Sequence, residues 1–179
     1  MDQFHLSLKV ILFPLHPATP PEGQSLQQLF AGRGIDVKAS QAAMAERMAD
    51  EGLPYGDRTM TYNSRRAQEL AKWAESVGAG KQIHNLLYQT YFVAGNNLAA
   101  SDTLDEVVRQ LGLSVETANQ ALETAEFSAL VDADWQRCHE LGITGVPAFV
   151  CNGRGVIGAQ SLGALQQLVR SAGARERVR

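Results

Sequence analysis

The chain has 179 residues, of which 45% are hydrophobic and 20% charged, and its formal net charge is −3. This composition is typical of a globular domain, and the lack of clustered Lys or Arg argues against nucleic acid as a partner. The longest apolar run, 10–15, is far shorter than the roughly 20 residues of a membrane span. Two cysteines make no disulfide framework, so we expect a cytoplasmic protein without a membrane partner.

The first predicted element is a buried strand over Leu6–Phe13, where β-branched and apolar residues gather. Prolines and glycine in 14–23 then force an extended loop. From Ser25 to about Gly142 the apolar residues repeat with a helical period. Asp102 and Ser114 are expected to cap two of these helices. The helical stretches are 67–77, 83–94, 104–111, 115–122 and 127–141.

After Gly142 the period changes from helix to strand. Ala148–Cys151 is predicted to be a strand, Asn152-Gly153 is a strong hairpin signal, and 155–159 forms the returning strand. Leu162, Leu165, Leu168 and Val169 mark a closing helix. The first predicted strand and the final hairpin can belong to one sheet only if the helices between them are inserted into the sheet domain. We therefore predict an α/β fold with a large all-helical insertion.

Five motifs, in order and in register, resemble the DsbA-type thiol–disulfide oxidoreductases, specifically their FrnE-like branch. They are Phe13-Pro14-Leu15-His16-Pro17 with Pro20-Pro21-Glu22-Gly23; Tyr62-Asn63-Ser64; His84 through Tyr91-Phe92 and Gly95; Gly142-Ile143-Thr144-Gly145-Val146-Pro147; and Gly158-Ala159-Gln160. The resemblance covers nearly the whole chain and implies a thioredoxin-like sheet domain over 1–23 and 143–179. Residues 24–142 then form the helical insertion domain.

The resemblance also implies a leading strand and a helix bearing Cys-x-x-C, which this sequence lacks. The fold is therefore expected to be incomplete, the sequence to be truncated, and no residue to be catalytic. The first strand of the family lies between the strands matching Leu6–Phe13 and Ala148–Cys151. Without that strand, the two neighbouring strands would expose an apolar edge with unpaired backbone groups. We expect this edge to be covered in one of three ways: the two strands pair directly, the natural protein is longer and supplies the missing strand, or a second copy of the chain fills the gap. A homodimer is our hypothesis.

The resemblance assigns substrate binding to Val146 and to Pro147, which it expects to be a cis proline. An extended thiol peptide or glutathione would pair with the Val146 backbone. Cys138 is expected to be a small buried hydrophobe on a helix. Cys151 ends a strand, and only Arg154 nearby could activate it. No other cofactor is expected.

Two further patterns favour no site. Gly153 to Gly158 has the G-x-G-x-x-G spacing of a dinucleotide loop, but Val156-Ile157 predicts a strand inside it. The histidines lack metal-ligand spacing, so no metal is expected, and His84, beside an apolar helical stripe, is expected to be a hydrogen-bonded packing residue. The chain is predicted to belong to the oxidoreductase family without running its dithiol cycle. The alternatives are a non-catalytic peptide- or glutathione-binding or assembly module, and a glutathione-dependent isomerase or transferase.

Overall fold

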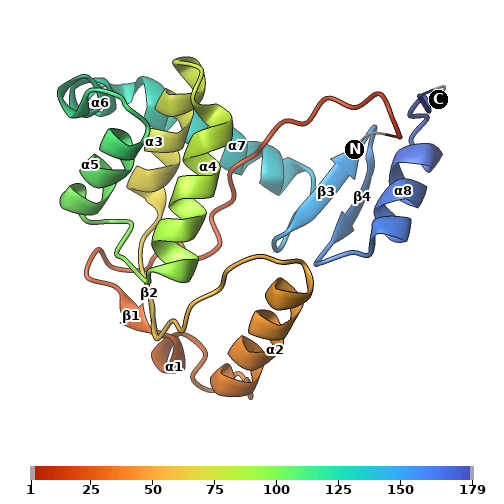
Figure 1. Cartoon of the computed structure of the whole chain (residues 1–179), viewed down its shortest axis with the longest axis horizontal. Helices are drawn as coiled ribbons and strands as arrows, with labels where there is room; N and C mark the ends of the chain where they lie inside the picture. Colours follow the sequence, from red (N-terminus) through yellow and green to blue (C-terminus); the bar gives the residue numbers. More distant parts are fainter. Residues whose placement is uncertain (1–2, 178–179) are drawn as a thin grey trace. The chain divides into compact units, whose positions relative to one another are not determined.

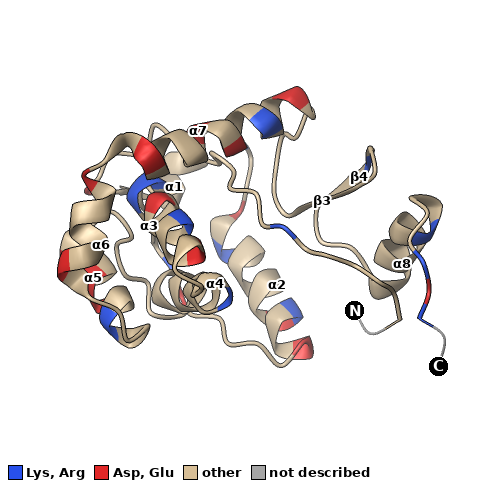
Figure 2. Cartoon of the chain, turned by 90° about the horizontal axis from the view of Figure 1, so that it is seen from above, with Lys and Arg blue, Asp and Glu red and all other residues tan. Residues whose placement is uncertain are grey.

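The computed structural model describes residues 3–177, which divide into two compact units. The helical unit comprises residues 16–131, and the hairpin unit comprises the described residues of 1–15 and 132–179. The helical unit is continuous in sequence, whereas the hairpin unit is made of two segments. The domain boundaries expected at 23 and 142 stay a prediction. Basic and acidic residues both occur along the helices (Figure 2).

The helical unit contains two short strands and most of the helices (Figure 1). The strands, β1 and β2, pair antiparallel, with Gln24 opposite Thr61 and Ser25 opposite Met60. The elements in chain order are β1 Gln24–Ser25, α1 Leu26–Leu29, α2 Val37–Asp50, β2 Met60–Thr61, α3 Arg65–Ser76, α4 Gly80–Tyr88, the π-helix η1 Gln89–Val93, α5 Ser101–Gln110, α6 Val115–Leu122 and α7 Ala125–Glu140, which continues into the hairpin unit.

The core of the helical unit surrounds α3. Leu70 and Ala74 are completely buried, and α4 and α5 contribute Ile83, Val107 and Val108 to the same cluster. These residues are the ones that the helical period placed inward, so the apolar stripes of neighbouring helices bury one another. The predicted helices of this region are confirmed.

The predicted caps have different outcomes. The Ser114 hydroxyl accepts a hydrogen bond from the Thr117 N–H at 3.2 Å, which confirms it as the N-cap of α6. The prediction for Asp102 is wrong, because Ala100 is the N-cap of α5 and Asp102 lies in the first turn. Its carboxylate is favourable there without capping, since the N-terminus of a helix carries partial positive charge.

The hairpin unit contains β3 Ala148–Cys151, β4 Arg154–Ile157 and α8 Leu162–Ser171. Asn152 and Gly153 form the turn with φ values of 47° and 76°, which confirms the predicted hairpin. Val156 and Ile157 lie in β4, so the glycine-rich segment is a hairpin arm and not a dinucleotide loop. The predicted closing helix is also confirmed.

The predicted strand over Leu6–Phe13 is wrong, because these residues form no strand in the structure. The backbone of Leu12 instead forms hydrogen bonds with side chains of α7. Its N–H donates to the Asp134 carboxylate at 2.9 Å, and its carbonyl accepts from Cys138 Sγ at 3.6 Å. A strand requires a neighbour that takes these groups, and among the described residues β3 pairs with β4 alone. Direct pairing of this segment with β3 is therefore not observed.

Candidate functional site

The candidate site begins where α7 ends. Gly142 has a φ of +64°, and its N–H donates to the His139 carbonyl at 3.0 Å. The N–H of Ile143 donates to the Cys138 carbonyl at 2.9 Å. These bonds occupy carbonyls of the last helical turn, and the left-handed glycine redirects the chain toward β3.

The loop reaches β3 through the Val146–Pro147 peptide bond, which is cis. The Pro147 carbonyl accepts from the Gly158 N–H at 2.7 Å, just after β4. The Gln160 side chain then donates to the Ile157 carbonyl at 3.0 Å. The motifs around Pro147 and Gly158, which flank the hairpin in sequence, are thus joined by a hydrogen bond and close the open end of the hairpin.

The outer edge of β3 presents unpaired backbone groups at alternate residues. In an antiparallel ladder, residues that exchange hydrogen bonds with the neighbouring strand alternate with residues that face away. Pro147 bonds Gly158, and the register continues with Phe149 opposite Val156. Among the described residues, the backbone groups of Ala148 and Val150 therefore point away from β4. We call these two residues, together with Val146 in the loop just before β3, the β3 edge.

Apolar side chains surround the β3 edge. The exposed fraction is 48% for Val146 and 45% for Val150, and Phe149 and Ile157 on the same hairpin are also exposed. Unpaired backbone groups beside exposed apolar side chains are the usual requirements for binding an extended peptide by strand addition.

Cys138 is buried on α7 and has no disulfide partner, as predicted for a small packing residue. Burial raises the pKa of its thiol, and the neighbouring carboxylate of Asp134 raises it further. Its Sγ donates to the Leu12 carbonyl. Because the thiolate is the reactive form, this environment suppresses nucleophilic attack by Cys138.

Cys151 is the last residue of β3, is half-buried and has no disulfide partner. The hairpin register places it opposite Arg154, the neighbour that the sequence indicated. Within residues 3–177, no group of three His, Cys, Asp or Glu side chains has the arrangement of a metal site. No described helix combines the length and apolar character of a membrane span.

The sequence did not indicate the role of Asp134. Val131, Asp134 and Cys138 share one face of α7, and all three are buried. The available signal was a single Asp three residues after Val131 on an otherwise apolar helical face. Such a carboxylate is buried with the face, and a buried carboxylate requires a hydrogen-bond donor from elsewhere in the chain. Leu130 and Leu141, which the period placed inward, are exposed: Leu130 lies off the face of α7 that carries Val131, and Leu141 follows the end of the helix at Glu140.

His84 was expected to be a packing residue that forms hydrogen bonds. Its Nε2 lies 3.0 Å from Glu75 Oε1, and the same carboxylate lies 3.6 Å from Lys72 Nζ. His84 therefore joins α4 to α3 within the helical unit, as the sequence indicated.

The helices, the hairpin and the terminal helix define the class of protein: a thioredoxin-like fold with a large helical insertion. A family model, the DSBA-like thioredoxin domain, matches residues 2–170. The chain belongs to the DSBA-like thioredoxin domain family. The predicted fold class and family are thereby confirmed.

Solved structures agree with this assignment. A probable DsbA oxidoreductase of Streptomyces coelicolor is 26% identical with a TM-score of 0.77, over 92% of this chain and 75% of that one. A 2-hydroxychromene-2-carboxylate isomerase is 16% identical with a TM-score of 0.67, over 75% and 66%. The cytosolic disulfide reductase DsbM of Pseudomonas aeruginosa, solved with glutathione, is 18% identical with a TM-score of 0.52, over 75% and 71%. Among curated proteins, none matches this chain.

Proposed function

We propose that this chain is a FrnE-like member of the thiol–disulfide oxidoreductase family that binds an extended thiol peptide or glutathione at the β3 edge. In the form given by its 179 residues it binds without running the dithiol cycle. The observation that carries the proposal is the alternation of unpaired backbone groups at Ala148 and Val150, which follows from the register of β3 with β4.

Strand addition explains why backbone groups, and not polar side chains, form the site. A bound peptide supplies N–H and C=O groups to the β3 edge, and alternate side chains of the peptide face the apolar surface beside Phe149. This mode depends little on peptide sequence. It therefore suits a protein that recognises many thiol-containing substrates.

The dithiol cycle requires a low-pKa thiolate and a second thiol that resolves the mixed disulfide. The sequence contains two cysteines and no Cys-x-x-C. Cys138 is buried, and its pKa is raised by burial and by Asp134. Cys151 is accordingly the one thiol of the chain with access to solvent, and a single thiol cannot complete the cycle.

The five sequence motifs support the FrnE-like assignment, and the 26% identity to the Streptomyces oxidoreductase supports the broader DsbA-type family. The cytoplasm is the compartment we propose, since the two free thiols suit reducing conditions. In the absence of peptide, a second copy would pair with the same β3 edge, so a homodimer that peptide binding dissociates belongs to this proposal. Light scattering at micromolar concentration should give the mass of a dimer, and the mass of a monomer would remove this part.

Insulin reduction with dithiothreitol tests the catalytic half of the proposal. We expect the rate with this chain to equal the uncatalysed rate, and Cys151→Ser to change nothing. An oxidoreductase with Cys-x-x-C provides the positive control. Clear turnover that Cys151→Ser abolishes would overturn this half, because a single exposed thiol would then suffice.

Calorimetry tests the binding half with two probes, glutathione and an extended thiol peptide. Saturable binding of either supports the proposal. S-methylated peptide serves as the matched control, because strand addition should tolerate the modification while thiol exchange should not. Binding of neither probe by the folded chain would contradict the assignment of the β3 edge as a peptide site.

A further inference from the structure

Arg58, in the helical unit, is held in a fixed orientation by aromatic rings. Its Cζ lies 4.6 Å from the ring centroid of Tyr91 and 5.1 Å from that of Phe92. The guanidinium donates to the Tyr91 hydroxyl and, at 3.4 Å, to the Met60 carbonyl. Stacking of this kind fixes the plane of the guanidinium and presents its remaining N–H groups in a defined direction.

Arg58 has no acidic partner among the described residues. Its Nε is buried and forms no hydrogen bond within residues 3–177. This Nε–H has lost water without gaining an acceptor, which is unfavourable. The two acceptors of the guanidinium, the Tyr91 hydroxyl and the Met60 carbonyl, are both uncharged, and an external oxyanion would add a charged acceptor for its other N–H groups.

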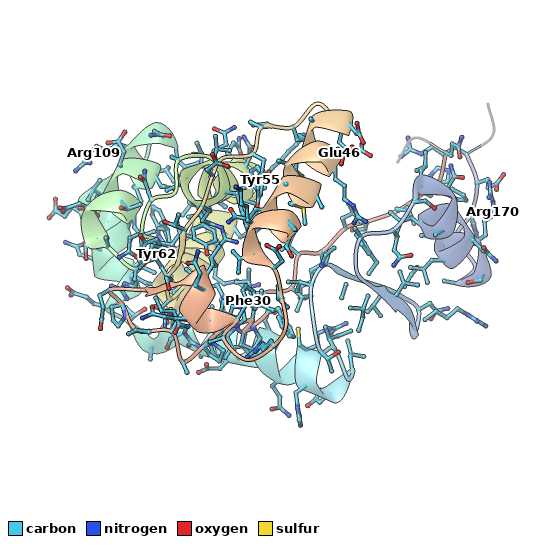
Figure 3. All side chains as sticks on the ribbon, turned by 90° about the horizontal axis from the view of Figure 1, so that it is seen from below. Phe30, Glu46, Tyr55, Tyr62, Arg109 and Arg170 are labelled. Atoms are coloured by element: carbon cyan, nitrogen blue, oxygen red, sulfur yellow. The ribbon has the colours of Figure 1, made fainter. Side chains whose placement is uncertain are left out.

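Backbone and ring contacts place two more basic residues, His16 and Arg33, in the same region of the helical unit as Arg58. The Leu26 N–H donates to the Thr59 carbonyl at 2.8 Å, so the β1–β2 pairing brings the start of α1 next to residue 58. Phe30 follows α1 (Figure 3), and its carbonyl accepts from the Arg33 N–H at 3.1 Å. The His16 ring stands edge-on to Phe30 at 6.4 Å between centroids.

The charges of this region act on one another. The pKa of His16 is lowered, first by burial and then by the positive charges of Arg33 and Arg58. The turn that follows His16 contains Thr19, whose N–H donates to the His16 carbonyl at 3.1 Å. The Thr19 hydroxyl is buried and has no partner among the described residues. Native structures seldom leave buried polar groups in this state.

We propose that His16, Arg33 and Arg58, which we call the basic cluster, form a binding site for the oxyanion group of a small ligand, either a carboxylate or a phosphate. Arg58 supplies fixed planar donors, Arg33 supplies a flexible exposed charge, and His16 supplies a ring N–H. All three belong to the helical unit. The site therefore stands independently of peptide binding at the β3 edge.

The test uses inorganic phosphate and acetate, titrated separately into the full chain at constant ionic strength. Binding is followed by NMR through the His16 ring resonance, which is assigned by its loss in His16→Gln. We expect saturable binding of at least one anion. Tighter binding of phosphate identifies a phosphoryl ligand, and tighter binding of acetate identifies a carboxylate.

Variants then assign the binding to the basic cluster. Arg58→Lys keeps the charge but loses the planar donors, and should weaken binding about 10-fold. Arg33→Gln should weaken it by up to about 5-fold, since Arg33 is exposed and screened. Arg109→Gln, on exposed α5 surface, is the matched control and should leave binding unchanged.

Two results would overturn the proposal. One is the absence of saturable shifts with both anions, and the other is binding by Arg33→Gln and Arg58→Lys as tight as that of the parent chain. If Arg58→Lys fails to fold, Arg33→Gln decides alone, because its exposed side chain makes no described contact on which the fold depends.

Discussion

The helical unit and the hairpin unit bury their apolar residues to different extents. In the helical unit, Leu70, Ile83 and Val107 are shielded from solvent by neighbouring helices. In the hairpin unit, Val146, Phe149, Val150 and Ile157 remain exposed on a sheet of two strands. A helix satisfies its own backbone, whereas a strand depends on a neighbour. We therefore expect the helical unit to contribute most of the folding stability, and the hairpin unit to bind an extended peptide by strand addition.

Truncation of a core leucine should produce the largest effect. Leu70→Ala should lower the free energy of unfolding by about 3 kcal/mol, because Leu70 is 0% exposed and the cavity cannot fill. Trp73 on the same helix reports this by fluorescence in urea, in a Trp135→Phe background. Leu162→Ala is the matched control: Leu162 is 70% exposed on α8, and the change should stay within about 0.5 kcal/mol. Equal losses in both variants would contradict the comparison.

Removal of the Asp134 carboxylate should have an intermediate effect, confined to the hairpin unit. Asp134→Ala leaves the Leu12 N–H without its acceptor, and should cost about 1–2 kcal/mol. Hydrogen exchange of the Leu12 amide should accelerate, while that of Leu70 in α3 should not. An unchanged Leu12 exchange rate would show that Asp134 does not hold the segment on α7.

The two thiols should differ in reactivity, with little effect on stability. Because burial and Asp134 raise the pKa of Cys138, its thiolate should form only above the pH at which a free cysteine ionises. Labelling with iodoacetamide at pH 7, followed by peptide mass spectrometry, should modify Cys151 first. Labelling of Cys138 should increase as the pH rises, and earlier labelling of Cys138 than of Cys151 would contradict its burial.

The helices could be predicted because their signals are local. The spacing of Leu70, Ala71 and Ala74 follows from one helical period, and Ser114 can cap α6 without help from distant residues. The hairpin was predictable for the same reason, since Asn152-Gly153 forms its turn. The strand over Leu6–Phe13 was not, because whether an apolar segment pairs as a strand depends on which neighbour is present.

The candidate sites also differ in how far the sequence could predict them. The loop at Val146 and Pro147 followed from sequence motifs, whereas the unpaired groups of the β3 edge required the observed register. The basic cluster was not predicted, because His16, Arg33 and Arg58 lie far apart in sequence. The β1–β2 pairing brings them together, and two-residue strands leave almost no pattern in the sequence.

Backbone hydrogen exchange at the β3 edge tests the central claim most directly. The amides of Val146, Ala148 and Val150 should exchange rapidly in the free monomer and become protected when an extended thiol peptide is added. The Gly153 amide in the hairpin turn, which faces no added strand, should keep its rate. Protection that falls on Phe149 and Cys151 alone, or no change at the β3 edge when peptide is bound, would contradict strand addition at this site.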